Sequence, residues 1–576
     1  MGSNILLCKS CASQCHQRIC QVVLKVDQSP ISLIIDSATD DSQVHYLCLM
    51  IQTVHNNRPR MFLYRNIRLS SDETAAGQTG TITAAFEEDG ITDIMKERMK
   101  SFVSDGASVN LGRKSSIATM LEEFVGHPLV KIHCMAHKLN LAVRKSFTDK
   151  NFKWIFYIES LLKQVYVFFM NKGHKRMSFL REAMGGEKIT FGGNYETRWA
   201  ASEKKAVKVI INHHGKIVKA LEDLSMDTSF RPEVRQTAVG LVKQLSNKNV
   251  MLIFYYFYDV LDVIETSSLQ FQKRYGLLVD QCKNIEDMTS SLRKIGSLCG
   301  GHYVSEFLKS CTCGADKCNN LLTYEKTEEV VCNGVTLIKQ GRHSQIPDLS
   351  DVAHQLTSKL LEELNSYIPQ SSVESFDVLN PFNWPKDTYP FDGQLQFRES
   401  DLKASYNAVY MEEDPYELSV GSEELVEDWR SMLRKITTDS KWCKMIASKD
   451  ILVFWEHYLG TNLIPEKLKD LIRNILAIPV GSADVERAFS ILTHIRDSRR
   501  SQLTAEHIED ALRIRMNGPS PDEFNSIKYA TSWVNSGKMR SDDPNRVQPK
   551  RQRILNEKGE EIAEMEFKYM GGSALF

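Results

Sequence analysis

The amino-acid sequence predicts an α/β core that is interrupted by a large all-helical block. Short runs of β-forming residues, separated by helical segments, fill roughly the first 150 residues. The β signal nearly vanishes from 151 to about 448, and helices continue to about residue 516. The 576 residues also exceed what one hydrophobic core usually supports. We therefore expect a Cys-rich segment (1–25), a first part of the core (26–150), a helical insertion (151–448), a second part of the core (449–520) and a polar tail (521–576).

The composition excludes several classes of protein. Hydrophobic residues make up 42% and charged residues 25%, unlike a disordered chain, a fibre or a multi-span membrane protein. The formal net charge of -1 argues against a wholly basic nucleic-acid binder, although a local basic face remains compatible with it. The most apolar window, 250–264, is too short to span a bilayer and contains Asp259 and Asp262. We expect it to form a buried helix, and we expect no membrane partner.

The chain has 13 cysteines, an odd number, and residues 1–7 do not resemble a secretory signal. This combination favours a reducing compartment with free or metal-bound thiols. An N-terminal cluster could be half of a zinc site, but a second pair of ligands is missing from the sequence. A second, looser group of three cysteines is more typical of buried structural thiols. The N-terminal cluster is Cys8, Cys11, Cys15, His16 and Cys20, and the second group is Cys311, Cys313 and Cys318.

The first part of the core is expected to follow the order β-β-β-α-β-α-β. Three runs of β-formers with short connections between them predict an antiparallel meander, with a turn at 55–58. The expected strands are 31–36, 44–54, 61–69, 101–105 and 129–133, and the expected helices lie within 74–100 and at 116–124.

In the insertion, a period near 3.6 predicts helices, whereas 323–347 is mixed and 371–415, rich in Asp, Pro and aromatics, suggests a long loop. In the second part of the core, Thr504 can cap the last helix. The expected helices are 154–170, 206–224, 232–245, 352–367, 451–459, 463–476, 483–495 and 505–516.

Two carboxylates close strands that are expected to be neighbours. Asp36 ends the first strand and Asp105 ends the fourth, and these strands can lie side by side and parallel in such a unit. Carboxylates one strand spacing apart repel each other, which raises one pKa, and a divalent metal relieves the repulsion. Oxygen ligands of this kind suit Mg²⁺, which can activate a water or a 3′-hydroxyl. Glu486 is a third candidate, because it lies about 100° from the apolar stripe of its helix and can face the sheet edge.

Several segments together resemble the hAT superfamily of DNA transposases, and more closely their domesticated vertebrate descendants. The resemblance spans about residues 26–520, and no single motif carries it alone. The matching segments are LIIDSATD at 33–40, SDGASVN at 104–110, CMAHKLNL at 134–141, TRW at 197–199, IPVGSADVERAFS at 478–490 and RRSQL at 499–503.

The resemblance implies an RNase H-like mixed-sheet core interrupted by a large all-α insertion. It implies that Asp36, Asp105 and Glu486 are the catalytic residues and the metal ligands. It also implies self-association through the C-terminal segment, for which we expect the apolar side chains of its helices to serve, namely Val485, Phe489, Leu492 and Leu512.

The resemblance further implies DNA-binding residues, each of which has a structural alternative. Trp199, which follows Arg198, would stack on a flipped base, or it could be a core residue between helices. Cys134 and His137 form a C-x2-H pair, which is too few ligands for zinc and favours a structural or substrate-positioning role. Basic groups at 172–176, 204–208 and 496–500 could contact phosphates, although scattered solvated helix faces are the commoner explanation.

Three functions follow from these expectations. The first is a transposase-derived nuclear protein that self-associates and contacts DNA or nuclear protein partners, with catalysis reduced or lost. The second is an active Mg²⁺-dependent transposase or nuclease, and the third is an adaptor or ligase in a ubiquitin-like modifier pathway. A basic run at 549–553 is compatible with a nuclear address or with a solvated tail.

Overall fold

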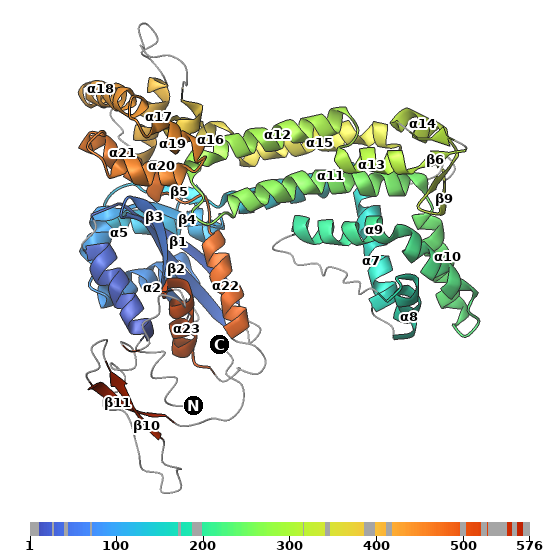
Figure 1. Ribbon diagram of the computed structural model, residues 1–576, viewed down its shortest axis with the longest axis horizontal. Coiled ribbons are helices and arrows are strands. Elements are labelled where there is room, and N and C mark those ends of the chain that lie inside the picture. Colours follow the sequence, from blue (N-terminus) through green and yellow to red (C-terminus); the bar gives the residue numbers. More distant parts are fainter. Residues whose placement is uncertain are drawn as a thin grey trace.

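The computed structural model shows a mixed α/β core from which a long helical arm projects (Figure 1). It describes residues 11–25, 28–39, 44–69, 72–170, 174–186, 199–314, 316–318, 320–339, 346–384, 398–410, 418–495, 503–519, 527, 550–555 and 561–567.

The core is built on a five-stranded sheet with the order β3-β2-β1-β4-β5. The first three strands form the predicted antiparallel meander, and β1 pairs in parallel with β4, which in turn pairs in parallel with β5. Asn56 and Asn57 adopt positive φ angles of 52° and 61°, as a two-residue hairpin turn requires. The strands are β1 (Ile31–Thr39), β2 (His45–His55), β3 (Arg58–Arg68), β4 (Met99–Ser104) and β5 (Val130–His133).

The two faces of the sheet are covered by helices from opposite ends of the chain. Side chains alternate along β1, so Leu33 and Ile35 pack on the face covered by α2 (Ala75–Glu88), α3 (Thr92–Arg98) and α5 (Ile117–Val125). Ile34 packs on the other face, against buried residues of α22 (Ala483–Ile495) and α23 (Ala505–Asn517). In Figure 1 these two helices lie beside the strands although they come from the far end of the sequence. The core is therefore assembled from two separated parts of the chain.

The arm consists of helices that run side by side away from the sheet (Figure 1). Its central helix, α11 (Lys248–Phe271), is buried over most of its length, which confirms the predicted buried helix at 250–264. Among the described helices, none is long and apolar enough to cross a membrane. Helix α6 (Met135–Phe147) precedes the insertion and packs against α15. The other helices of the insertion include α7 (Lys153–Met170), α8 (His174–Ala183), α9 (Trp199–Met226), α10 (Pro232–Leu245), α12 (Gln281–Ser297), α13 (His302–Ser310), α14 (Leu321–Lys326) and α15 (Leu349–Tyr367).

A helical lobe lies where the arm meets the sheet. Its helix α21 packs against β1, β2 and β3, and Ser32 of β1 donates a hydrogen bond of 2.6 Å to the carbonyl of Ala477. Trp384 packs among Trp429, Trp442 and Trp455 in the same lobe. The lobe contains α18 (Leu418–Thr437), α19 (Trp442–Ala447), α20 (Ile451–Leu459) and α21 (Glu466–Ala477).

The structure corrects three local predictions. The expected loop at 371–415 contains α16 (Ser371–Glu374), two 3-10 helices and α17 (Glu399–Tyr410), because described apolar side chains such as Phe376, Leu402 and Val409 are buried. The insertion is not wholly helical, since residues 312–338 include a small four-stranded sheet. The expected polar tail contains a hairpin of β10 (Lys550–Leu555) and β11 (Glu561–Phe567).

Candidate functional site

The pairing of β1 with β4 brings Asp36 and Asp105 close together. Ile34 is paired with Val103, and each aspartate follows two residues later along the chain. Asp105 comes directly after β4, but β1 continues past Asp36 to Thr39, so the prediction that Asp36 ends its strand is wrong. The pKa of Asp36 is raised to about 7, mainly by burial and also by the negative charges of Asp105 and Glu486, whereas the hydrogen bond from the Ser37 amide lowers it. The three predicted acids therefore lie close enough for the charges of two of them to act on the third.

Asp105 is held in place by the turn that follows it. The backbone N–H of Ala107 donates to Asp105 Oδ1 at 3.1 Å, and the side-chain amide of Asn110 donates to the same oxygen at 2.7 Å. Asn110 lies on the short helix α4 (Ser108–Leu111). These two hydrogen bonds fix the orientation of the carboxylate relative to the strand.

Gly106 allows His133 to approach this turn. Gly106 has a φ of +74°, and a Cβ there would lie 2.2–2.5 Å from three atoms of the His133 imidazole. Burial lowers the pKa of His133 to about 4, with smaller contributions from Lys138 and His137, so the ring is neutral at pH 7. Within the described part of the chain, the buried Nε2 atom of His133 has no hydrogen-bond partner. Sequence reasoning missed His133, although it is the last residue of β5, the strand beside β4.

Glu486 is positioned by the stripe that anchors its helix. It lies in the first turn of α22, which packs against β1 and β2. Val485 and Ala488 are buried against the sheet, whereas Glu486 is half-buried. The predicted offset of Glu486 from the stripe therefore leaves its carboxylate at the edge where it raises the pKa of Asp36.

The C-x2-H pair joins the two parts of the core. Cys134 is 1% exposed, and Ser482 donates hydrogen bonds to its sulfur from both its backbone and its hydroxyl group. The backbone N–H of Met135 donates to the carbonyl of Val480 at 3.1 Å. Cys134 thus fastens the segment that leads into Glu486, and its side chain offers no exposed surface to a nucleic acid. His137 is half-buried, and its ring centroid lies 5.4 Å from that of His133.

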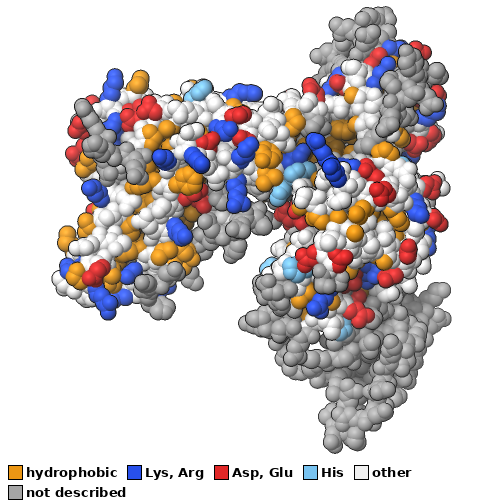
Figure 2. Space-filling model, turned by 180° about the vertical axis from the view of Figure 1, so that it is seen from behind, with side chains coloured by type: hydrophobic (Ala, Val, Ile, Leu, Met, Phe, Trp, Pro, Cys, Tyr) orange, Lys and Arg blue, Asp and Glu red, His pale blue; other side chains and the backbone are white. Residues whose placement is uncertain are grey.

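The other predicted DNA-binding residues remain predictions. Trp199 begins α9, but its side chain and the whole of Arg198 lie outside the described residues. Lys204 pairs with Asp262 and Glu265, and Lys175 donates to the hydroxyl of Ser229. On the face drawn in Figure 2, Lys and Arg side chains are scattered among acidic and uncharged ones and do not form one patch.

The predicted dimerisation residues pack inside the chain. Val485 and Leu512 are fully buried and Leu492 is 6% exposed, in a cluster with residues of β1, β2, β3 and β4. Phe489 is partly buried and packs against the same cluster. These side chains anchor α22 and α23 to the sheet, and of the four only Phe489 keeps a partly exposed surface. Their role in contacting a second copy stays a prediction.

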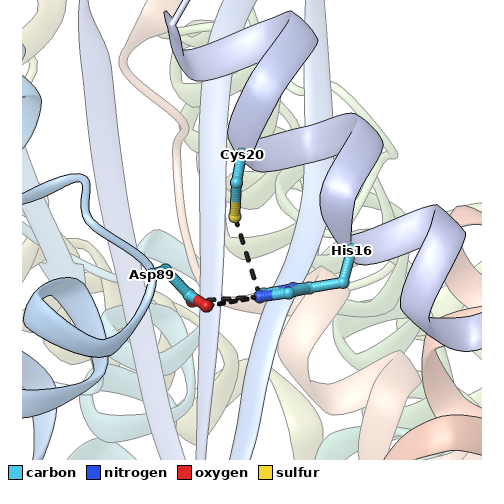
Figure 3. A group of neighbouring side chains, drawn as sticks. All are labelled: His16, Cys20 and Asp89. Carbon is cyan, nitrogen blue, oxygen red and sulfur yellow. Dashed lines mark hydrogen bonds and ion pairs between the residues drawn. The ribbon is translucent and has the colours of Figure 1, made fainter.

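The N-terminal cysteine cluster does not gather at one point. His16, Cys20 and Asp89 place ligand atoms within 4.8 Å of one another, and His16 Nε2 lies 3.0 Å from both carboxylate oxygens of Asp89 (Figure 3). Asp89 also accepts hydrogen bonds from Tyr64 at 2.7 Å and from Arg65 at 2.9 Å. The carboxylate is thus already neutralised by a cation, which favours a hydrogen-bonded network over a metal site.

Two other members of that cluster, Cys11 and Cys15, belong to a small apolar cluster of their own. Cys11 and Cys15 pack against Ile514, and Cys8 lies outside the described residues. Burial raises the pKa of Cys20 to about 12, so its sulfur remains a thiol at neutral pH. Zinc in this segment remains an untested prediction.

Residues 432–517 match the family model described as the hAT family C-terminal dimerisation region. The matched segment runs from the end of α18 through α23 and contains Glu486. The match supports membership of the hAT family and a transposase-like protein that can self-associate.

Proposed function

We propose that this chain is a self-associating hAT-type protein whose sheet is an RNase H-like core and whose three acids bind divalent metal for the cleavage or transfer of DNA strands. The observation that carries the proposal is the pKa of Asp36, which Asp105 and Glu486 raise from positions far away in the sequence. The order β3-β2-β1-β4-β5, with one acid on β1 and one directly after its parallel neighbour β4, supports the RNase H-like assignment.

The residues at the sheet edge fit Mg²⁺. Three carboxylates provide hard oxygen ligands, and their mutual repulsion is what a divalent cation would relieve. Bound Mg²⁺ would supply an activated water or 3′-hydroxyl and would stabilise the leaving oxygen of a phosphodiester.

The chain's own residues have separate tasks in this proposal. Ala107 and Asn110 orient Asp105, and the buried stripe of α22 orients Glu486. Asp36 must lose its proton to bind a metal, so metal affinity rises with pH up to about 7. His133 is neutral at pH 7, and its buried Nε2 atom, which has no hydrogen-bond partner among the described residues, lies beside the turn that holds Asp105.

The proposal is tested on the full chain with hairpin DNA and with flanked-end DNA, in the presence of Mg²⁺ or of EDTA. We expect metal-dependent cleavage that Asp105→Asn and Glu486→Gln each abolish. Asp287→Asn is the matched control, because Asp287 is an exposed carboxylate on α12. Equal activity of the wild type and Asp105→Asn would exclude catalysis by these acids.

A second candidate is a non-catalytic protein that self-associates and contacts DNA or nuclear partners. The match of residues 432–517 to a dimerisation region favours it independently of the acids. Sedimentation of the wild type at micromolar concentration, together with the cleavage assay, separates the two candidates. A stable dimer without metal-dependent cleavage supports this second function, whereas a strict monomer counts against both.

A further inference from the structure

Four of the 13 cysteines lie in the small sheet of the insertion, far from the three acids along the arm (Figure 1). The sheet has the order β7-β6-β8-β9 and lies beside α13 and α14. Cys313 belongs to β6 and Cys332 to β8, while Cys311 and Cys318 flank β6 and β7. The strands are β6 (Thr312–Cys313), β7 (Asp316–Lys317), β8 (Glu329–Cys332) and β9 (Val335–Ile338).

The strand register places the four sulfur atoms on one face of this sheet. Thr312 is paired with Lys317 on one side and with Val331 on the other, so Cys311 is opposite both Cys318 and Cys332. The N–H of Cys318 donates to the carbonyl of Cys311 at 2.9 Å, which extends the β6–β7 pairing to these two residues. Cys313 lies two residues beyond Cys311 and therefore on the same face.

The sulfur atoms are in contact in two pairs. The thiol of Cys311 donates a hydrogen bond to the sulfur of Cys332, and a disulfide joins Cys313 to Cys318. Cys311, Cys318 and Cys332 are at most 1% exposed, and Cys313 is half-buried. The other neighbours on this side include the apolar or aromatic residues Val330, Leu337 and Tyr324, and the hydroxyl group of Ser310 lies 3.3 Å from the sulfur of Cys332.

Two tight turns bring the strands together directly after a cysteine. Gly314 follows Cys313 with a φ of +69°, and Asn333 and Gly334 follow Cys332 with φ angles of 52° and 77°. Strands of only two to four residues contribute little stability by themselves, so a cross-link or a metal would add to what packing against the arm supplies.

We propose that Cys311, Cys313, Cys318 and Cys332, with all four as thiolates, bind one Zn²⁺ that holds this sheet together. Four thiolates are a common ligand set of structural zinc, with sulfur atoms about 3.8 Å apart around a tetrahedral ion. In a reducing compartment, a thiol or phosphine reductant first donates two electrons to the Cys313–Cys318 disulfide, and two protons complete the two thiols that form. Each of the four thiols then releases its proton on binding, so zinc also takes the place of the Cys311–Cys332 hydrogen bond. One ion would then link three strands, whereas the disulfide links only two neighbouring ones.

The sheet also holds helices of the arm, so zinc would stabilise more than the sheet itself. A Cβ on Gly215 of α9 would lie 2.6 Å from the carbonyl oxygen of Asn333, close to the kink of α9 at His213. The N–H of Ile338 donates to the carbonyl of Ser246, between α10 and α11, at 2.9 Å. The β8–β9 hairpin thus packs against α9, α10 and α11.

The test is the zinc content of the full chain, purified with a phosphine reductant and without added metal. We expect one zinc per chain by mass spectrometry of the metal, and its loss in Cys311→Ser and in Cys332→Ser. Two cysteine controls should keep the zinc, namely Cys443→Ser, an exposed residue of α19, and Cys20→Ser in the N-terminal network.

A readout on the wild type keeps the test independent of how the variants fold. Cobalt reconstitution of the metal-stripped chain should produce the thiolate charge-transfer absorption of a four-sulfur site. The proposal is overturned if the chain purified with the reductant binds neither zinc nor cobalt. It is also overturned if peptide mapping shows that this chain still contains the Cys313–Cys318 disulfide. Zinc that is lost only in Cys20→Ser would overturn it as well, and neither result bears on the DNA assay of the acids.

Discussion

The sulfur of Cys134 packs directly against the backbone of Gly481, where a Cβ would lie only 2.6 Å away. This contact joins the two separated parts of the core next to the helix that carries Glu486. Gly481→Ala should therefore lower the free energy of unfolding by about 1–3 kcal/mol, because neither the sulfur nor the loop has room to move. Chemical denaturation followed by circular dichroism measures the change.

Two matched variants test the cause of that effect. Gly240→Ala on α10, where a Cβ meets nothing within 4 Å, should be neutral or stabilising because alanine favours helix. In the Cys134→Ala background, Gly481→Ala should cost much less than in the wild type. A loss of stability that is the same in both backgrounds would contradict the contact.

The charge of Asp36 should make the chain less stable as the pH rises. Its pKa is about 7 in the folded chain and 3.8 ordinarily, so between these values the folded chain holds a proton that the unfolded chain releases. The free energy of unfolding then falls from about pH 4 to about pH 7. In EDTA, Asp36→Asn should be more stable than the wild type at pH 8 by roughly 1–3 kcal/mol and similar to it near pH 4. Asp287→Asn should follow the wild type at both pH values, and a wild type with no loss of stability over this range would refute the assignment.

Gly106 should tolerate no side chain, for two separable reasons. Its φ of +74° strains any L-residue by roughly 1–2 kcal/mol, and a Cβ would also collide with His133. Gly126→Ala, at a φ of +82° with nothing within 4 Å, carries only the backbone strain. We expect Gly106→Ala to lower the midpoint of thermal unfolding clearly more than Gly126→Ala does. Equal shifts would mean that the imidazole can move away.

Mutation of the apolar stripe of α22 should lower the stability of the fold directly, and any loss of self-association should follow from that. Leu492 is 6% exposed in the cluster that holds α22 on the sheet. Leu492→Ala should lower the free energy of unfolding by about 2–5 kcal/mol, as for other large-to-small changes in a core. Denaturation and sedimentation equilibrium of the same sample separate the two effects. A variant of unchanged stability that becomes monomeric would show that the stripe contacts the partner copy instead.

The sequence was sufficient to predict the parts of the fold with a strong local signal. Each of the runs before Asp36 and Asp105 is a strand, and the short connections define a meander, so the sheet follows from pattern alone. The position of Glu486, beside the apolar stripe of α22 and not within it, could also be predicted from the spacing of the apolar residues. An apolar stripe does not show which surface it packs against, however. Leu492 packs against the chain's own sheet, where we expected contact with a second copy.

Other features depend on contacts that no local pattern contains. His133 becomes part of the site only because β5 pairs with β4 and Gly106 leaves room for its ring. The small cysteine sheet has strands of two to four residues, too short to show a period of two. In α17, by contrast, Leu402 and Val409 are buried at helical spacing, but the surrounding Asp and Pro residues obscured that signal.

The attachment of α11 to the core has a mechanical consequence. The carbonyl of Gln272, the residue after the helix ends, accepts a hydrogen bond from Arg487, the neighbour of Glu486. With 24 residues, α11 is about 36 Å long, so a rotation of about 5° at this joint would move its far end by about 3 Å. A displacement of the distal end of α11 would therefore be transmitted through this hydrogen bond to Arg487, the residue next to Glu486.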